Sequence, residues 1–108
     1  MYKFCFYVPE THLESVKHKV FSAGAGKIGD YDRCAWQTRG EGQFRPLPNS
    51  DPFLGAHGKD ERVVEYKVEM VCEDHLMRAV LAAFKTAHPY EEPAYDIWRL
   101  SAEEELSA

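Results

Sequence analysis

An α+β fold, with two helices on one face of a four-stranded antiparallel sheet, is predicted by two features of the 108-residue sequence. Alternating apolar residues mark strands, and apolar residues at helical spacing mark helices. Their order along the chain is βαβ twice. Right-handed crossovers place both helices of such a plan on the same side of the sheet, which is the ferredoxin-like βαββαβ arrangement.

The first half of the chain supplies one strand, one helix and a second strand. Residues 2–8 alternate apolar and polar side chains, which predicts the first strand. A helix is predicted over residues 11–23, because Thr11 and Glu14 have the spacing of a capping box before an apolar stripe. The second strand is predicted over residues 30–39, with the following GEGQF as a bulged continuation.

A glycine-rich segment, GAGKIG at residues 24–29, separates this helix from the second strand. As a string it matches the G-x-G-x-x-G dinucleotide fingerprint, which needs a strand before it and a helix after it. Here the order is reversed, so the glycines adjoin the negative end of a helix dipole. The context favours a helix C-cap and a turn over a phosphate site.

The second half of the chain repeats the plan. Residues 62–71 alternate most regularly and predict the third strand, a helical stripe over residues 76–87 ends before a proline, and residues 94–100 predict the fourth strand. We expect one domain over residues 1–100 and a polar tail over residues 101–108, which has little to bury.

Composition excludes several classes of function. The net charge of -5 and the scattered basic residues argue against nucleic acid as a partner. No apolar run approaches the roughly 20 residues that cross a bilayer, and the N-terminal residues lack the features of a secretory signal. Three widely spaced cysteines fit neither a disulfide framework nor a zinc ribbon. We therefore expect a cytoplasmic protein with reduced thiols and no membrane partner.

One short stretch, AHPYEEPAYD at residues 87–96, concentrates polar and aromatic side chains between two prolines. A histidine and two carboxylates suit zinc or another divalent ion, and they could also exchange protons with a substrate. The alternative is a stiff helix-to-strand connector with solvated glutamates. The proposed metal ligands are His88, Glu91 and Glu92, and the proposed ligand-binding residues are these three with Tyr90, Tyr95 and His57.

His57 belongs to a long irregular segment, residues 45–60, which carries three prolines and two glycines. A loop of this length inside a compact domain usually serves a function or is ordered by a neighbouring subunit. We expect its 46–58 portion and the 88–92 turn to form one cleft. The chain carries no Ser-His-Asp order, nucleophile elbow, HExxH or P-loop, so a non-enzymatic module is favoured.

Three segments together, GAGKIGDYDRCAW, GEGQFRPLPNSDPFLGAHGKDERVVEYKVE and AHPYEEPAYDIW, resemble the domain inserted into the Nif-three-like (NGG-one interacting factor) proteins. That domain is also found as short stand-alone chains, and its fold is related to the CutA and PII signal proteins. The resemblance implies a ferredoxin-like, CutA/PII-like domain that forms a homotrimer with ligand sites between subunits. Full-length members carry a dinuclear metal site on a separate domain, so none of those ligands and no hydrolase activity is carried over to this chain.

Three functional hypotheses remain open. The first is a non-enzymatic trimeric module that binds a divalent metal ion or a small ligand at subunit clefts. The second is an enzyme that uses His88 with a glutamate as acid and base. The third is a structural or regulatory trimerisation module for a separate Nif-three-like protein that carries the metal domain.

Overall fold

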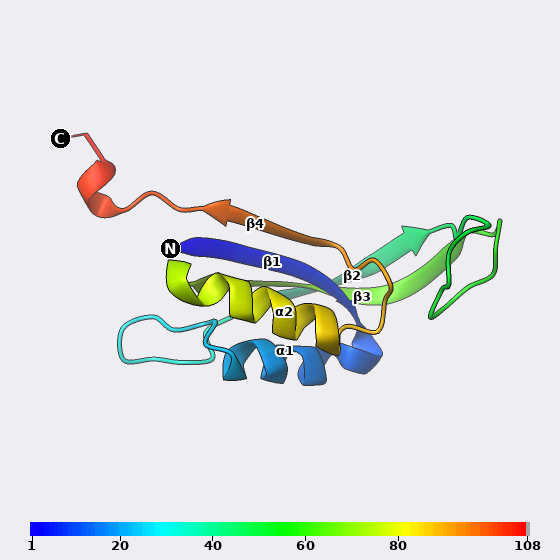
Figure 1. Cartoon of the computed structure of the whole chain (residues 1–108), viewed down its shortest axis with the longest axis horizontal. Helices are drawn as coiled ribbons and strands as arrows, with labels where there is room; N and C mark the ends of the chain where they lie inside the picture. The colour runs from blue at the N-terminus through cyan, green and yellow to red at the C-terminus, as the bar shows by residue number, and fades with distance from the viewer. Residues whose placement is uncertain (108) are drawn as a thin grey trace.

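A computed structural model describes residues 1–107 of the chain. One antiparallel sheet has the strand order β2-β3-β1-β4 and is covered on one face by two helices (Figure 1). The strands are β1 (Tyr2–Pro9), β2 (Trp36–Phe44), β3 (Glu61–Cys72) and β4 (Tyr95–Arg99), and the helices are α1 (Leu13–Ser22) and α2 (Met77–Ala87). The predicted fold class is confirmed.

The core lies between the helices and the inner face of the sheet. Phe84 of α2 meets Phe4 and Phe6 of β1 with ring centroids 5.3 and 5.0 Å apart. The side chains that share this layer come from both helices and from β1 and β3, and they are Phe4, Phe6, Val8, Leu13, Val16, Val20, Val68, Met70, Cys72, Met77, Val80 and Phe84. Their alternation along β1 and β3 follows the period of two that the sequence shows.

The sequence prediction of the second strand was wrong about where the strand starts and about the bulge. Residues 30–35 form a turn and irregular backbone, and β2 begins only at Trp36. From there the strand runs without a bulge to Phe44, pairing residue by residue with β3 from Glu69 to Glu61. Aromatic and β-compatible residues predicted the strand too early, and Gly40 and Gly42 do not end it because β3 pairs with both.

The prediction of a capping box was also wrong. Residues Glu10–His12 form a 3₁₀ turn, α1 starts at Leu13, and no side chain caps it. The Thr11 hydroxyl is hydrogen-bonded to the His12 ring at 2.8 Å instead. Glu14 pairs with Lys17 one turn along at 3.1 Å, so both side chains of the supposed box have other partners.

The glycine-rich segment closes α1 as predicted. Gly24 has a φ of +116°, its N–H donates to the Phe21 carbonyl, and the Ala25 N–H donates to the Val20 carbonyl. This pair of bonds is a Schellman motif, which requires a left-handed residue after the helix. Gly26 then donates to the Val71 carbonyl and ties the following turn to β3.

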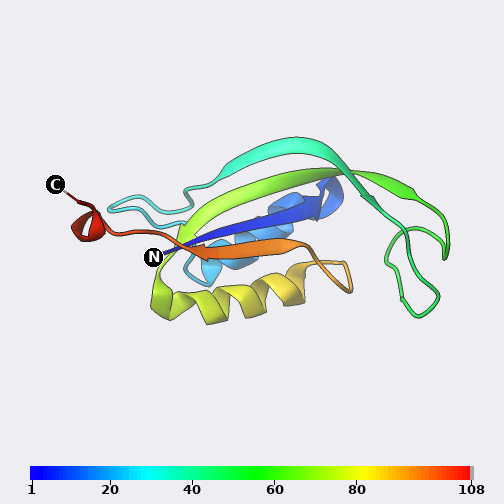
Figure 2. The same ribbon diagram turned by 90° about the horizontal axis from the view of Figure 1, so that it is seen from above.

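Within residues 1–107 no helix covers the outer face of the sheet, and β2 runs along a free edge (Figure 2). Register places Trp98 on this face, opposite Lys3, and Ile97 on the inner face opposite Phe4. Beyond the sheet, residues 45–60 form an irregular loop that projects from one end of the molecule. At the opposite end, residues 101–107 lead away from the sheet through a short 3₁₀ turn, Glu103–Glu105, while Ala108 lies outside the described residues.

Candidate functional site

The turn from α2 to β4 is organised around His88. Its side chain is 5% exposed, and both ring nitrogens have partners. Nε2 lies 2.7 Å from the Tyr7 carbonyl, to which it donates, and Nδ1 accepts the Tyr90 N–H at 3.1 Å. These two bonds define a neutral imidazole that joins β1 to the turn. In this conformation His88 acts as the connector that the sequence left open, with no nitrogen free for a metal ion or a substrate proton.

The surroundings of His88 disfavour its charged form. The ring packs against Phe84 and Tyr90, with centroids 5.3 and 4.9 Å away. Burial lowers the pKa of His88, the bond to the Tyr7 carbonyl opposes this, and the charge of His12 adds a smaller lowering effect. Protonation would also replace the acceptor at Nδ1 with a donor facing the Tyr90 N–H. Lowering the pH should therefore destabilise this turn.

The long loop is fastened to the same turn. The Asp51 N–H donates to the Glu91 carboxylate at 2.7 Å, across 40 residues of sequence. Within the loop, the His57 ring is hydrogen-bonded to the Ser50 carbonyl at 2.9 Å, and the Gly58 N–H donates to the Pro46 carbonyl at 2.8 Å. The predicted meeting of the two segments is therefore present within a single chain.

Aromatic rings reinforce this closure. Phe44 ends β2 just before the loop and Phe53 lies within it, and their ring centroids are 5.8 and 6.3 Å from that of Tyr90. Phe53 also meets the His12 ring edge-on at 5.4 Å. Such ring pairs stabilise by roughly 0.5–1.5 kcal/mol beyond their buried area. They keep the loop close to the body of the domain.

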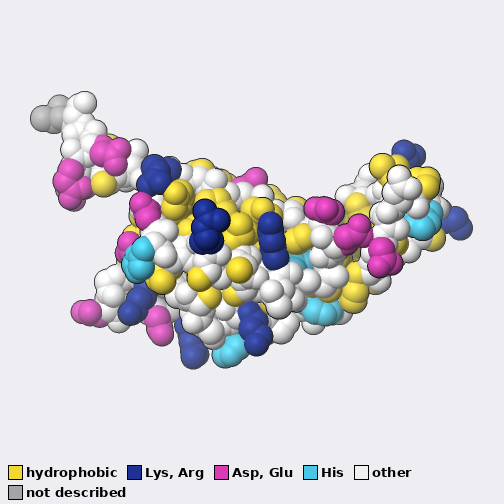
Figure 3. Space-filling view, in the orientation of Figure 1, with side chains coloured by type: hydrophobic (Ala, Val, Ile, Leu, Met, Phe, Trp, Pro, Cys, Tyr) yellow, Lys and Arg dark blue, Asp and Glu magenta, His cyan; other side chains and the backbone are white. Residues whose placement is uncertain are grey.

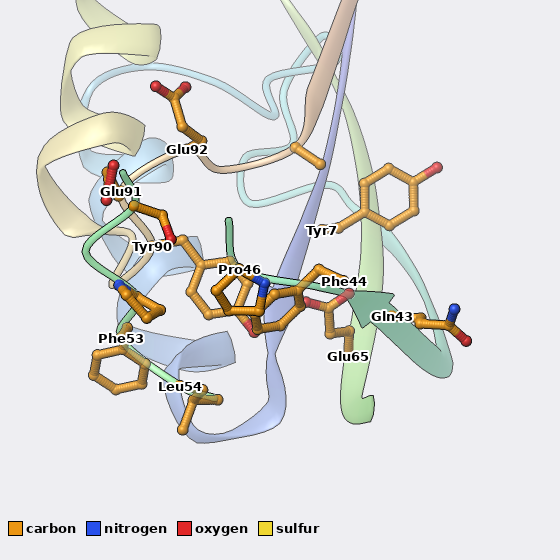
Figure 4. A pocket seen from close by; sticks show the side chains of 13 residues that line it. Tyr7, Gln43, Phe44, Pro46, Phe53, Leu54, Glu65, Tyr90, Glu91 and Glu92 are labelled. Atoms are coloured by element: carbon orange, nitrogen blue, oxygen red, sulfur yellow. The ribbon is translucent and has the colours of Figure 1, made fainter. Parts of the chain in front are cut away.

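A cavity of about 300 Å³ lies between the loop, the turn and the outer face of the sheet (Figure 4). Its size is at the lower end of small-molecule sites in proteins. Rings and aliphatic groups make up most of the wall, and they belong to Tyr7, Phe44, Pro46, Pro52, Phe53, Leu54, Tyr90 and Ala94. The polar members are Gln43, Ser50, Glu65, Glu91 and Glu92.

Glu65 of β3 is the half-buried carboxyl group in this wall. Its carboxyl group lies over Gly42 of the neighbouring strand, where a Cβ atom would fall 1.9 Å from Oε1. Burial raises the pKa of Glu65, and a contact with Tyr90 partly offsets the rise. Burial, followed by the Glu65 charge, raises the pKa of Tyr90. The buried Tyr90 hydroxyl has no regular hydrogen bond to any residue of the described range 1–107.

A second, more open groove continues from the cavity over the outer face of the sheet. The two share four residues, Tyr7, Gln43, Glu65 and Ala94. The groove differs in charge because Arg39 and Lys67 line it together with acidic side chains. Its floor includes Gly40 and Gly42, which present no side chain. The positive charges of this region thus lie beside the cavity and not in its wall.

The predicted site residues are only partly brought together. Tyr90, Glu91 and Glu92 line the cavity, His88 supports Tyr90 from behind, and His57 holds the loop without reaching the wall. Tyr95 lies elsewhere, with its ring 5.6 Å from that of Phe84 in the core. Within residues 1–107 no three His, Cys, Asp or Glu side chains form a group suited to a metal ion. The metal ligand set stays a prediction.

Sequence reasoning missed Glu65, Phe44 and Phe53. Glu65 lies on the outward side of β3, where carboxylates are ordinarily solvated, and in the folded chain it is half-buried in the wall of the cavity. One signal was present in the sequence. Glycine inside a strand often marks a close approach by another group, and Gly42 is the position that the Glu65 carboxyl group approaches.

Comparisons with known proteins show relatives in sequence and in fold. No protein-family model matches the chain. A GTP cyclohydrolase 1 type 2 homolog of Mycobacterium leprae is 49% identical over 98 residues, and one of Bacillus subtilis is 43% identical over 96. These matches cover 91% and 89% of this chain. A crystal structure of a Bacillus cereus protein related to NIF3 superposes on 94% of the chain with a TM-score of 0.79 and 40% identity. The chain is homologous to one segment of the NIF3-related proteins.

This NIF3-related segment spans about a quarter of those relatives, 26% of the Mycobacterium leprae protein and 26% of the Bacillus cereus chain. The resemblance read from the sequence is thus confirmed. CutA proteins share the fold at low identity. The PII-like protein CutA from Nostoc has a TM-score of 0.68 at 14% identity, and CutA from Archaeoglobus fulgidus has 0.65 at 16%. Among residues 1–107, no helix has the length and apolar character needed to cross a membrane.

Proposed function

We propose that this NIF3-related segment is a non-enzymatic, trimeric module that binds a small organic ligand in the cavity between its long loop and the 88–94 turn. The observation that supports it most strongly is the loop's attachment. A projecting loop is ordered over the sheet by the Asp51 to Glu91 hydrogen bond and by rings around Tyr90, and a mostly apolar cavity remains beneath it. Concave apolar walls with a few polar groups are typical of ligand sites.

The proposal of a trimer depends on the open sheet face and on the shared fold. Trp36 and Trp98 lie on that face, 71% and 46% exposed, and none of the helices in the described part of the chain covers it. Exposed aromatic residues of this kind are typical of protein interfaces. The CutA-like fold supports the same arrangement, in which the cavity would lie near a neighbouring subunit.

A divalent ion at His88, Glu91 and Glu92 fits this arrangement less well. The two His88 nitrogens serve the Tyr7 carbonyl and the Tyr90 N–H, and one Glu91 oxygen serves the Asp51 N–H. Metal binding would have to break these bonds. The same bonds argue against His88 as an acid or base. The activity in the relatives' name refers to proteins of which this segment spans about a quarter.

Native mass spectrometry of protein purified without added metal tests the proposal directly. We expect a trimer. Where ligand is retained, the added mass should equal that of one, two or three ligand molecules. A monomer would overturn the trimeric part. Added mass equal to a metal ion, lost after chelation, would restore the metal hypothesis over the organic ligand.

A structural or regulatory trimerisation module is the second candidate, and the exposed tryptophans favour it equally. Its signature is a trimer without retained mass that forms a stable complex with the remainder of a NIF3-related protein. Replacing Trp36 and Trp98 with Ser would dissociate the trimer in either case. Loss of ligand binding together with the trimer would place the ligand between subunits.

A further inference from the structure

The wall of the cavity is one-sided in charge. Of the 13 residues that line it, all within the described range, three are glutamates and none is Lys, Arg or His. Figure 3 shows acidic side chains gathered where the projecting loop leaves the body of the domain. A ligand that carries negative charge would meet carboxylates there without a compensating cation, which costs binding free energy.

We propose that the cavity binds a small organic cation, a flat aromatic ring with an attached ammonium group that pairs with Glu65. This inference rests on the proposed ligand-binding function and adds the chemical class. The rings of Phe44, Phe53 and Tyr90 supply flat apolar surface for the ligand ring. Their faces also attract a cation within about 6 Å.

Glu65 provides the specific contact for the ammonium group. The carboxyl group is half-buried and close enough to the Tyr90 hydroxyl that its charge raises the pKa of that hydroxyl. Burial raises the pKa of Glu65, so its charge lacks full solvation when the cavity is empty of a cation. An ammonium donor would supply the missing hydrogen bonds to both oxygens. Glu91 is already engaged by Asp51, which leaves Glu65 as the better acceptor.

A phosphate-bearing ligand would find basic side chains only in the adjacent groove and none in the cavity wall. Arg39 and Lys67 line that groove, whereas the cavity wall has no basic side chain among its members. The two classes of ligand would therefore bind at different places on the domain. A cation would shift the amide signals of the loop around Phe53 and of the 90–94 turn. An anion would shift those of β2 near Arg39 and of β3 near Lys67.

Three matched probes test the class of ligand, namely tryptamine, indole and indole-3-acetate, with GTP as a phosphate-bearing probe. Their binding is followed by ¹H–¹⁵N chemical shifts of the full chain in its native oligomeric state. We expect tryptamine to shift the amides of residues 43–54 and 90–94 and to bind at least tenfold more tightly than indole-3-acetate. GTP is expected to leave these amides unmoved.

Two pairs of variants locate the contact. Glu65→Gln should weaken the binding of tryptamine about tenfold, or by about 1.4 kcal/mol. Glu69→Gln should leave it unchanged, because Glu69 lies on the same strand and face but outside the cavity wall. Gly42→Ala should act like Glu65→Gln, because its methyl group would displace the Glu65 carboxyl group. Gly40→Ala meets nothing within 4 Å and should bind as the parent chain does.

The outcomes distinguish the cationic class of the ligand from the proposed ligand-binding function. If indole or indole-3-acetate binds the cavity as tightly as tryptamine, or if Glu65→Gln and Glu69→Gln weaken tryptamine equally, the cationic class is overturned and a ligand site remains. If none of the four probes moves the amides of residues 43–54 and 90–94, the cationic class and the cavity as a ligand site are both overturned.

Discussion

The helix-covered face of the sheet and its open face are made by the same strands, yet their side chains meet different surroundings. On β1, Phe6 points under the helices and is fully buried, while the next residue, Tyr7, points outward into the candidate cavity. On β3, Val68 is fully buried and Glu65 is half-buried on the opposite face. Two helices cover the inner face, whereas the 45–60 loop covers only part of the outer face.

The comparison teaches that stability and function are divided between the two faces. The inner face is filled by close-packed rings and aliphatic groups, where a missing group leaves a void. The outer face retains an unfilled cavity, a carboxyl group with a raised pKa and exposed tryptophans. Features that cost stability without improving the packing are typical of binding sites.

The largest effect should come from adjacent substitutions on β1. Phe6→Ala should lower the free energy of unfolding by about 3–5 kcal/mol, because it leaves a cavity beside Phe4 and Phe84. Tyr7→Ala removes a side chain of similar size from the open face and should cost less than half as much. Chemical denaturation of both variants measures the difference. Equal losses would mean that the open face is packed like a core, as in a tightly closed oligomer.

His88, which joins the two faces, should give the next largest effect. His88→Ala leaves the Tyr7 carbonyl and the Tyr90 N–H without partners and should cost about 1–3 kcal/mol. The stability of the parent chain should also fall as pH drops through about 6.5, the ordinary pKa of histidine. The unfolded chain takes up this proton first because burial lowers the pKa of His88 in the folded state.

Thermal unfolding between pH 7.5 and 5 checks this contribution. The groups that face His88 are the Tyr7 carbonyl, the Phe84 ring, Tyr90 and the charge of His12. The variant His18→Gln, at an exposed position on α1, serves as the control and should keep the parent's pH dependence. A His88→Ala variant that keeps it as well would show that His88 does not titrate in this range.

The smallest effect should be a gain in stability. Burial raises the pKa of Glu65, so the folded state holds this proton to higher pH than the unfolded state. Above both pKa values the ionised carboxylate opposes folding, and Glu65→Gln should then be more stable than the parent by less than about 1 kcal/mol. Unfolding at pH 7 and pH 4 compares the two chains, and the advantage should disappear at pH 4. A loss at pH 7 would indicate a cationic partner for Glu65.

The local sequence was sufficient for most of the fold. Alternation placed the first, third and fourth strands to within two residues, and the helical stripes placed both helices, because periods of two and 3.6 report which side chains face a core. It placed the start of β2 too early and predicted a bulge that is absent from this strand, whose residues are nearly all exposed. An edge strand without a buried side lacks the pattern on which the prediction depends.

The sequence by itself determined the βαββαβ order, the apolar faces and the polar density of the 88–92 turn, because these follow from neighbours along the chain. Only the tertiary structure decided what that turn does. It pairs both His88 nitrogens with backbone groups, brings Glu91 to Asp51 and encloses Glu65 beneath a loop. These contacts join segments up to 81 residues apart. Hydrogen-bond partners and burial depend on such distant segments, so local periodicity cannot specify them.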